Sequence, residues 1–202
     1  MKTLIISIFT ALLLVTGIAA TTKAADSKDE TVTVLTGISA INKIEVHGNV
    51  ELYISDSETD EVKVYNKYYA ESALVQSRNG VLSIASYNTE KLVVWVKAAD
   101  LRSISAYDNA RVSSFGDISK IEFEVDLHNN ASAKLSLDAY SASVAVNDEA
   151  KASLSGRADE YTLKYSNAGN VNEKDFQPIH ASKTATTVAK IKKADLDDLA
   201  GL

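Results

Sequence analysis

The side chains in this sequence that could do chemistry are carboxylates, histidines and aromatic rings, because there is no cysteine. An acid pair, or acids with calcium, beside a groove is the arrangement used by many polysaccharide-cleaving enzymes. The acids available for it in the central part of the chain are Asp108, Asp126, Asp138, Asp148 and Asp159. His47, His128 and His180 lack the spacing of a metal site, and no glycine-rich calcium repeat is present. We therefore predict no catalytic residue, no metal site and no cofactor.

Aromatic side chains are the best indication of a binding function. The sequence has nine tyrosines and one tryptophan, Trp95, and aromatic rings on a β-sheet surface bind sugars or protein partners. Three tyrosines cluster in sequence and three lie near predicted corners of the chain. The six candidate binding residues are Tyr65, Tyr68, Tyr69, Tyr87, Tyr107 and Tyr140. The alternative for each is a strand-forming residue packed at the edge of a sheet.

The elements that carry these residues are predicted to be β-strands. From Val32 to about Val171, apolar and polar residues alternate with period two, as in Leu92-Val93-Val94-Trp95-Val96, and no helical pattern is visible. The only proline, Pro178, falls where this pattern ends. We predict one all-β domain over residues 26–177, followed by a flexible or short helical tail over 178–202.

The strand pattern repeats at about 20 residues. Small residues at Ala110, Ala131, Ala150 and Gly169 are spaced 21, 19 and 19 residues apart. Two positions before them lie Asp108, Asn129, Asp148 and Asn167, and six positions before them lie Ile104, Val125, Val144 and Leu163. A weaker unit with Ile84, Asn88 and Leu92 is expected to precede these four. Each position therefore keeps its character from one unit to the next.

This period predicts a β-solenoid, in which stacked coils place equivalent residues in columns along the axis. The Asp and Asn residues at 108, 129, 148 and 167 then form a structural column at the corners, because they tolerate left-handed backbone angles best after glycine. The alternative is an antiparallel meander or sandwich with hairpin turns at the same places. A meander gives no reason for the same side chain at each position of successive units.

The N-terminal segment resembles a secretory signal peptide. Lys2 precedes an apolar run from Leu4 to Ala20, and small residues follow it. We expect cleavage within about residues 20–25 and assign residues 1–25 to the signal, with an uncleaved membrane anchor as the alternative. No second apolar run of spanning length follows. The protein is thus predicted to be exported to the periplasm, the cell surface or the medium, without a transmembrane segment after cleavage.

The net charge of −6 argues against nucleic acid as a partner. A net negative charge also keeps an exported protein soluble, and this explanation requires no binding partner.

In its order of motifs the sequence resembles the family of exported bacterial proteins described as putative auto-transporter adhesins with a head GIN domain. The stretches that carry the resemblance are "ISAINKIEVHGNVELYISDSETDEVKVY", "RNGVLSIAS" and "LVVWVKAADLRSISAYDNARV". Ala99 stands where the family usually has proline. The resemblance covers about residues 32–175. It implies a right-handed β-helix-like fold, an adhesin-like role and no established enzymatic site.

Together these features predict an exported, non-catalytic domain with a binding or structural role at the bacterial cell envelope. The expected partner is an envelope protein or a glycan, and self-association through the ends of the stack is a further possibility. The alternative function is a glycan-active enzyme, a polysaccharide lyase or hydrolase, on the same fold.

Overall fold

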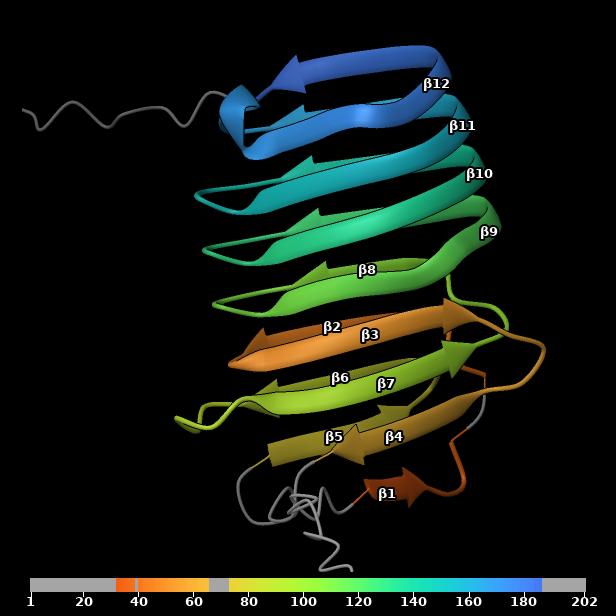
Figure 1. The fold of residues 1–202 in the computed structure, drawn as a ribbon, viewed down its shortest axis with the longest axis vertical. Coiled ribbons are helices and arrows are strands. Elements are labelled where there is room, and N and C mark those ends of the chain that lie inside the picture. Colours follow the sequence, from red (N-terminus) through yellow and green to blue (C-terminus); the bar gives the residue numbers. More distant parts are fainter. Residues whose placement is uncertain (1–31, 39, 66–72, 187–202) are drawn as a thin grey trace, which may run out of the picture.

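A computed structural model describes residues 32–38, 40–65 and 73–186. These residues form one curled sheet of twelve strands (Figure 1). The strands are β1 (Val32–Leu35), β2 (Lys43–Gly48), β3 (Val50–Asp56), β4 (Glu61–Tyr65), β5 (Ala73–Arg78), β6 (Val81–Ser86), β7 (Leu92–Ala98), β8 (Ser103–Ala106), β9 (Arg111–Leu127), β10 (Ser132–Val146), β11 (Lys151–Tyr165) and β12 (Val171–Ala185). A single turn of 3-10 helix, η1 (Ala168–Asn170), precedes β12. The prediction of an all-β protein is confirmed.

The four long strands β9 to β12 pair in parallel, each with the next along the chain. Each runs along one side of the molecule, bends and returns on the other side (Figure 1). Val144 pairs with Val125 on one side and with Leu163 on the other, as the repeat predicts. Val125 in turn pairs with Ile104 of β8. The parallel pairing excludes the antiparallel meander for this part of the chain.

The N-terminal strands are arranged differently from the order of the sequence. β2 pairs in parallel with both β6 and β8, and β3 pairs in parallel with both β7 and β9. Residues 43–56 are thus inserted between two segments that come later in the chain. β1, β4 and β5 pair antiparallel and lie at the N-terminal end of the sheet, remote from β12 (Figure 1).

This insertion corrects the alignment of the weak repeat unit. Ile84 pairs with Val46, and Val46 pairs with Ala106, so Ile84 lies in the column of Ala106 rather than that of Ile104. The prediction therefore aligned this unit with the others two residues out of register. It also missed that β2 and β3 lie between this unit and the next one.

The core is one continuous cluster of apolar side chains that the alternation directs inward. The column of Ile104, Val125, Val144 and Leu163 is at most 2% exposed. Neighbouring strands in a sheet are about 4.8 Å apart, so each of these side chains packs against its equivalents above and below. The inner face is therefore a set of apolar ladders.

Hydrogen bonds between equivalent corners fix the polar column. Asp108, Asn129 and Asp148 have φ angles of 60°, 57° and 54°. The backbone N–H of Asp108 donates to Oδ1 of Asn129 (3.2 Å), and the N–H of Asn129 donates to Oδ2 of Asp148 (2.9 Å). The N–H of Asp148 then donates to Oγ of Ser166 (3.2 Å). Each side chain thus satisfies a backbone donor at the preceding corner.

Asn167 does not take the fourth place in this column. Its φ is −137°, and its side chain accepts a hydrogen bond from the N–H of Gly169 as the cap of η1. The hydroxyl of Ser166 bonds to the preceding corner instead. The column predicted at 108, 129, 148 and 167 therefore has left-handed geometry only at its first three positions.

Replacing Asn129 by leucine should lower the free energy of unfolding by about 1–2 kcal/mol. The change removes the acceptor for the Asp108 N–H and places a bulky residue at positive φ. The neighbouring Asn130→Leu is the matched control, because Asn130 is exposed and is not at positive φ. Urea denaturation measures both; equal losses would contradict a specific role for the Asn129 side chain.

The last strand extends further than predicted. β12 continues through Pro178 to Ala185, so residues 178–185 are strand and not the start of a tail. Among the described strands, β12 pairs only with β11. Proline is tolerated in an edge strand, where its missing N–H can face away from the ladder. The signal peptide predicted at 1–25 and the remainder of the predicted tail, from 187 on, lie outside the described residues.

Candidate binding surface

Four aromatic side chains gather on the outer face of the sheet, and we call them the aromatic surface: Tyr53 of β3, Tyr65 of β4, Trp95 of β7 and Phe115 of β9. Tyr53 and Trp95 point outward because their neighbours in sequence alternate into the core. Trp95 is the centre of the group. Its ring centroid lies 4.8 Å from that of Tyr53, 5.9 Å from Phe115 and 6.4 Å from Tyr65.

The aromatic surface is held in place and partly open to solvent. The hydroxyl of Tyr53 donates to Oε1 of Glu51 (2.8 Å), and Nζ of Lys91 donates to Oε2 of the same carboxylate (3.0 Å). These two hydrogen bonds, that of Lys91 above all, lower the pKa of Glu51. Phe115 is 68% exposed. Tyr53, Tyr65 and Trp95 are half-buried. A partly exposed cluster of rings that is held in one orientation is suited to contact with a flat apolar ligand face.

A shallow groove of about 410 Å³ adjoins this surface across β9, β10, β11 and the start of β12. Two outward columns of residues form it. One runs Arg111, Ser132, Lys151 and the other runs Ser113, Lys134, Ser153. Along the strands and across them, each short serine lies next to a long Arg or Lys side chain. The groove is the space above the serines, and the cations lie along its borders. We call these six residues the basic groove.

A second aromatic group lies at the corners. The rings of His47, Tyr107 and His128 stack in a column, with centroid separations of 4.4 and 4.8 Å and interplanar angles of 2° and 8°. The hydroxyl of Tyr87 donates to Oδ2 of Asp108 (3.3 Å). These aromatic residues contact the corner column and help to fix the register of its strands.

The six predicted tyrosines therefore do not form one site. Tyr65 belongs to the aromatic surface, whereas Tyr87 and Tyr107 lie at the corners. Tyr140 is 59% exposed in β10, and no ring contact to it occurs within the described residues. Tyr68 and Tyr69 lie outside the described residues.

The prediction missed Tyr53 and Phe115 as binding candidates and noted Trp95 without placing it. Alternation alone marks Tyr53 and Trp95 as outward. Their contact depends on the pairing of β3 with β7, which the sequence does not reveal.

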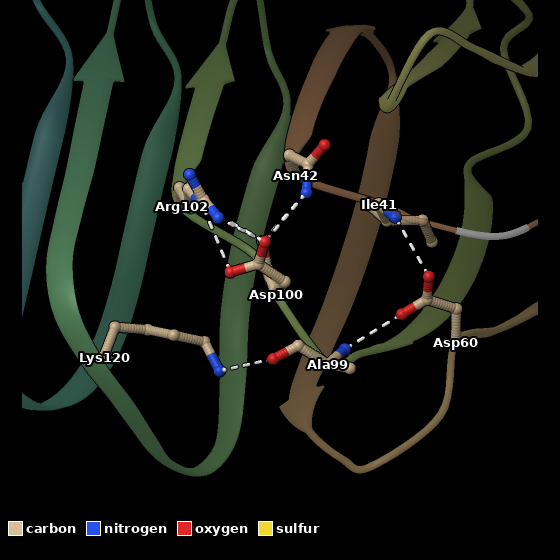
Figure 2. A network of polar contacts seen from close by, with 7 residues as sticks. All are labelled: Ile41, Asn42, Asp60, Ala99, Asp100, Arg102 and Lys120. Atoms are coloured by element: carbon tan, nitrogen blue, oxygen red, sulfur yellow. Dashed lines mark hydrogen bonds and ion pairs between the residues drawn. The ribbon is translucent and has the colours of Figure 1, made fainter.

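The carboxylates nearest to a second hollow, lined by Asp100, Lys120 and their neighbours, serve the structure. Figure 2 shows that both oxygens of Asp60 accept backbone N–H groups, from Ile41 and Ala99, each at 2.9 Å. Asp100 accepts from Nδ2 of Asn42 (3.1 Å) and from the guanidinium of Arg102, which lowers the pKa of Asp100. These bonds fasten the start of β2 to the connection between β7 and β8.

Four of the five acids considered at the outset, all except Asp159, are engaged in similar contacts. Asp126 accepts from Asn147 and lies 2.9 Å from Nε2 of His128, while Asp138 pairs with Arg157, which lowers the pKa of Asp138. Within the described ranges no three histidine or acidic side chains are placed to hold a metal ion. No helix in this part of the chain is long and apolar enough to cross a membrane.

Comparison with known proteins adds a family and a fold. The family model described as "Putative auto-transporter adhesin, head GIN domain" matches residues 40–199. No curated protein matches the chain.

Three solved structures are similar in fold. A putative adhesin from Bacteroides fragilis has a TM-score of 0.68 at 12% identity, over 78% of this chain and 77% of that one. A putative adhesin from Parabacteroides distasonis has a TM-score of 0.58 at 15% identity, over 78% and 79%. A putative lipid binding protein, also from Parabacteroides distasonis, has a TM-score of 0.51 at 13% identity, over 77% and 78%.

Proposed function

Because this chain belongs to the family "Putative auto-transporter adhesin, head GIN domain", we propose that it is an exported, non-catalytic protein that binds a partner at the bacterial cell envelope. The observation that carries the proposal is the aromatic surface around Trp95, in which four rings from four strands meet on one outer face. Partly exposed aromatic clusters of this kind are typical of surfaces that bind sugars or proteins. The names of the similar structures, two of them putative adhesins, agree with a binding role.

The scaffold we propose is a right-handed β-helix-like solenoid with coils of about 20 residues. The parallel pairing of β9 to β12 supports it, with equivalent corner residues 21 and 19 positions apart. A stack of this kind offers a long, rigid outer face, on which residues of successive coils line up.

The glycan-active enzyme is the less supported alternative. Such an enzyme needs an acid free to donate a proton and a second carboxylate opposite it. In the described structure Asp60 accepts two backbone N–H groups, and Asp138 is bound by Arg157. Glu51, the acid beside the basic groove, is bound by Lys91 and Tyr53.

Export is part of the proposal, and it assigns residues 1–25 to a signal peptide. The mature N-terminus is expected between Thr21 and Asp26. Intact mass of the exported protein tests this, and a retained Met1 would contradict cleavage.

Replacing Trp95 by alanine should weaken partner binding by about 30-fold or more, as expected for a central aromatic residue of an interface. The partner is first identified by screening the exported protein against glycan arrays and envelope proteins. Tyr140→Ala is the matched control, because Tyr140 is an exposed aromatic residue outside the aromatic surface. Binding that survives Trp95→Ala but fails with Tyr140→Ala would place the site elsewhere.

A further inference from the structure

The basic groove carries charge that the protein does not neutralise. Arg111, Lys134 and Lys151 form no ion pair with any described acid, whereas most other described cations do. The acid that also lines the groove, Glu51, is already bound by Lys91 at 3.0 Å. Lys134 and Lys151 are thus available to an anion from outside, whereas Arg111 makes no ion pair but lies opposite Glu51 and helps to lower the pKa of that carboxylate.

This charge stands apart from the rest of the molecule. The whole chain has a net charge of −6. The returning halves of the same long strands bear exposed or half-buried acids, Glu122, Glu124, Asp126 and Glu160. A basic strip on an otherwise acidic protein directs a negatively charged ligand to this one place.

The floor of the groove is made of hydroxyl groups. Ser113, Ser132 and Ser153 lie between the cations, and Asn172 borders them. The hydroxyls of Ser113 and Ser132 make no hydrogen bond to another side chain or backbone group within the described residues, and Nδ2 of Asn172 reaches Oγ of Ser153 only at 3.4 Å. Free hydroxyls can both donate and accept, which matches the hydroxyls of a sugar.

The groove continues into the aromatic surface along one line. Trp95 pairs with Tyr53, Tyr53 with Ser113, Ser113 with Lys134, and Lys134 with Ser153. Adjacent members are one strand apart, about 4.8 Å. Rings, hydroxyls and cations therefore follow one another at a regular spacing, and the line is open along the stack.

We propose that the basic groove and the adjoining Trp95 and Tyr53 rings bind an acidic polysaccharide, a polymer of sugars that carry carboxylates. The rings contact the apolar faces of the sugars, the serines bond to sugar hydroxyls, and the three cations bind the carboxylates. This inference rests on the proposed binding function and names its ligand class. A nucleic acid would also supply anions and rings, and its binding in the groove is an outcome that the test below distinguishes.

The test uses polygalacturonate as the probe, with its fully methyl-esterified form and an oligothymidine of similar length as comparisons. Binding of the exported protein is measured by calorimetry at low and at physiological salt. Polygalacturonate should bind, more weakly as salt increases, whereas the ester and the oligothymidine should bind at least about tenfold more weakly.

Variants assign the binding to the groove. Lys134→Gln with Lys151→Gln should weaken polygalacturonate binding by about tenfold or more. The matched control is Arg78→Gln with Lys164→Gln, which removes two charges of described residues that are likewise without an ion pair but lie outside the groove; it should leave binding within about twofold. Unchanged thermal unfolding of both double variants shows that each is folded.

The outcomes separate this inference from the proposed function. Equal binding of the ester, or no loss with the groove variant, overturns the acidic ligand, while a loss with Trp95→Ala still supports binding at the aromatic surface. Equal binding of oligothymidine overturns the polysaccharide in favour of any polyanion. If no polysaccharide binds but the screen yields a Trp95-dependent partner, only this inference fails; if Trp95→Ala affects no binding at all, both fail.

Discussion

Val144→Asp is expected to lower the free energy of unfolding by about 3–5 kcal/mol, because it buries a carboxylate without a partner. Val144 is 1% exposed and lies between Val125 and Leu163 in the middle of the apolar ladder. Nothing in that column can donate a hydrogen bond to a carboxylate. A loss of this size is a large fraction of the stability of an ordinary domain.

The neighbours Ser143 and Ala145 provide the control, since their side chains point to the outer face. Ser143 lies opposite Glu124 and Thr162, and Ala145 lies opposite Asp126 and Lys164. Aspartate at either site remains in contact with water, so the loss should stay below about 1 kcal/mol. Thermal and urea unfolding followed by circular dichroism measure all three variants. Similar losses at 143, 144 and 145 would mean that the alternation of β10 is wrong.

Gly156→Ala is expected to lower the free energy of unfolding by about 2–5 kcal/mol. Gly156 has a φ of +91°, where a side chain is strained, and a Cβ atom built there would lie 2.1 Å from the carbonyl oxygen of Leu137. Leu137 is the residue of β10 that pairs with Gly156. The alanine methyl group can fit only if one backbone moves away from the other.

Gly116 separates the two causes of that loss. Its φ is +82°, but a Cβ atom there meets nothing within 4 Å. Gly116→Ala should therefore show only the backbone penalty, about 1–2 kcal/mol. The difference between the two variants in urea denaturation isolates the steric term. Equal stability of the two variants would show that strands β10 and β11 are not closely paired at Gly156.

The repeat could be predicted from the sequence because all residues of one column must meet the same physical requirement. Val125, Val144 and Leu163 must be apolar to fill the inner face, and Asp108, Asn129 and Asp148 must tolerate positive φ. Such requirements recur in each of the paired long strands, at equivalent positions of their register. Alternation and corner residues are local properties, so a single sequence contains them.

The arrangement of the N-terminal strands was not readable, because it depends on pairing between distant segments. In the structure, β2 and β3 lie between the pair β6–β7 and the pair β8–β9. Nothing in the sequence of residues 43–56 distinguishes this arrangement from one in which β2 and β3 precede both pairs. The aromatic surface was missed for the same reason, since Tyr53 and Trp95 meet only through this pairing. The basic groove likewise requires the register that brings Arg111, Ser132 and Lys151 side by side.

The boundary at Pro178 was misjudged because proline is usually read as the end of a strand. That reading holds for a central strand, in which every N–H takes part in a ladder. β12 pairs with β11 alone among the described strands, and a proline is acceptable there. Whether a strand lies at the edge or in the centre depends on the arrangement of the whole sheet, which the proline itself does not reveal.

The inserted position of β2 and β3 also sets the order in which the nascent chain can become structured. A chain is synthesised from its N-terminus, and β10, β11 and β12 can each dock on the strand made just before. β2 and β3 have only later partners, and their apolar residues, such as Ile44 and Leu52, stay uncovered until β6 to β9 have emerged. Residues 43–56 are therefore the segment that waits longest for its partners, whereas β10, β11 and β12 can each pair as soon as they emerge.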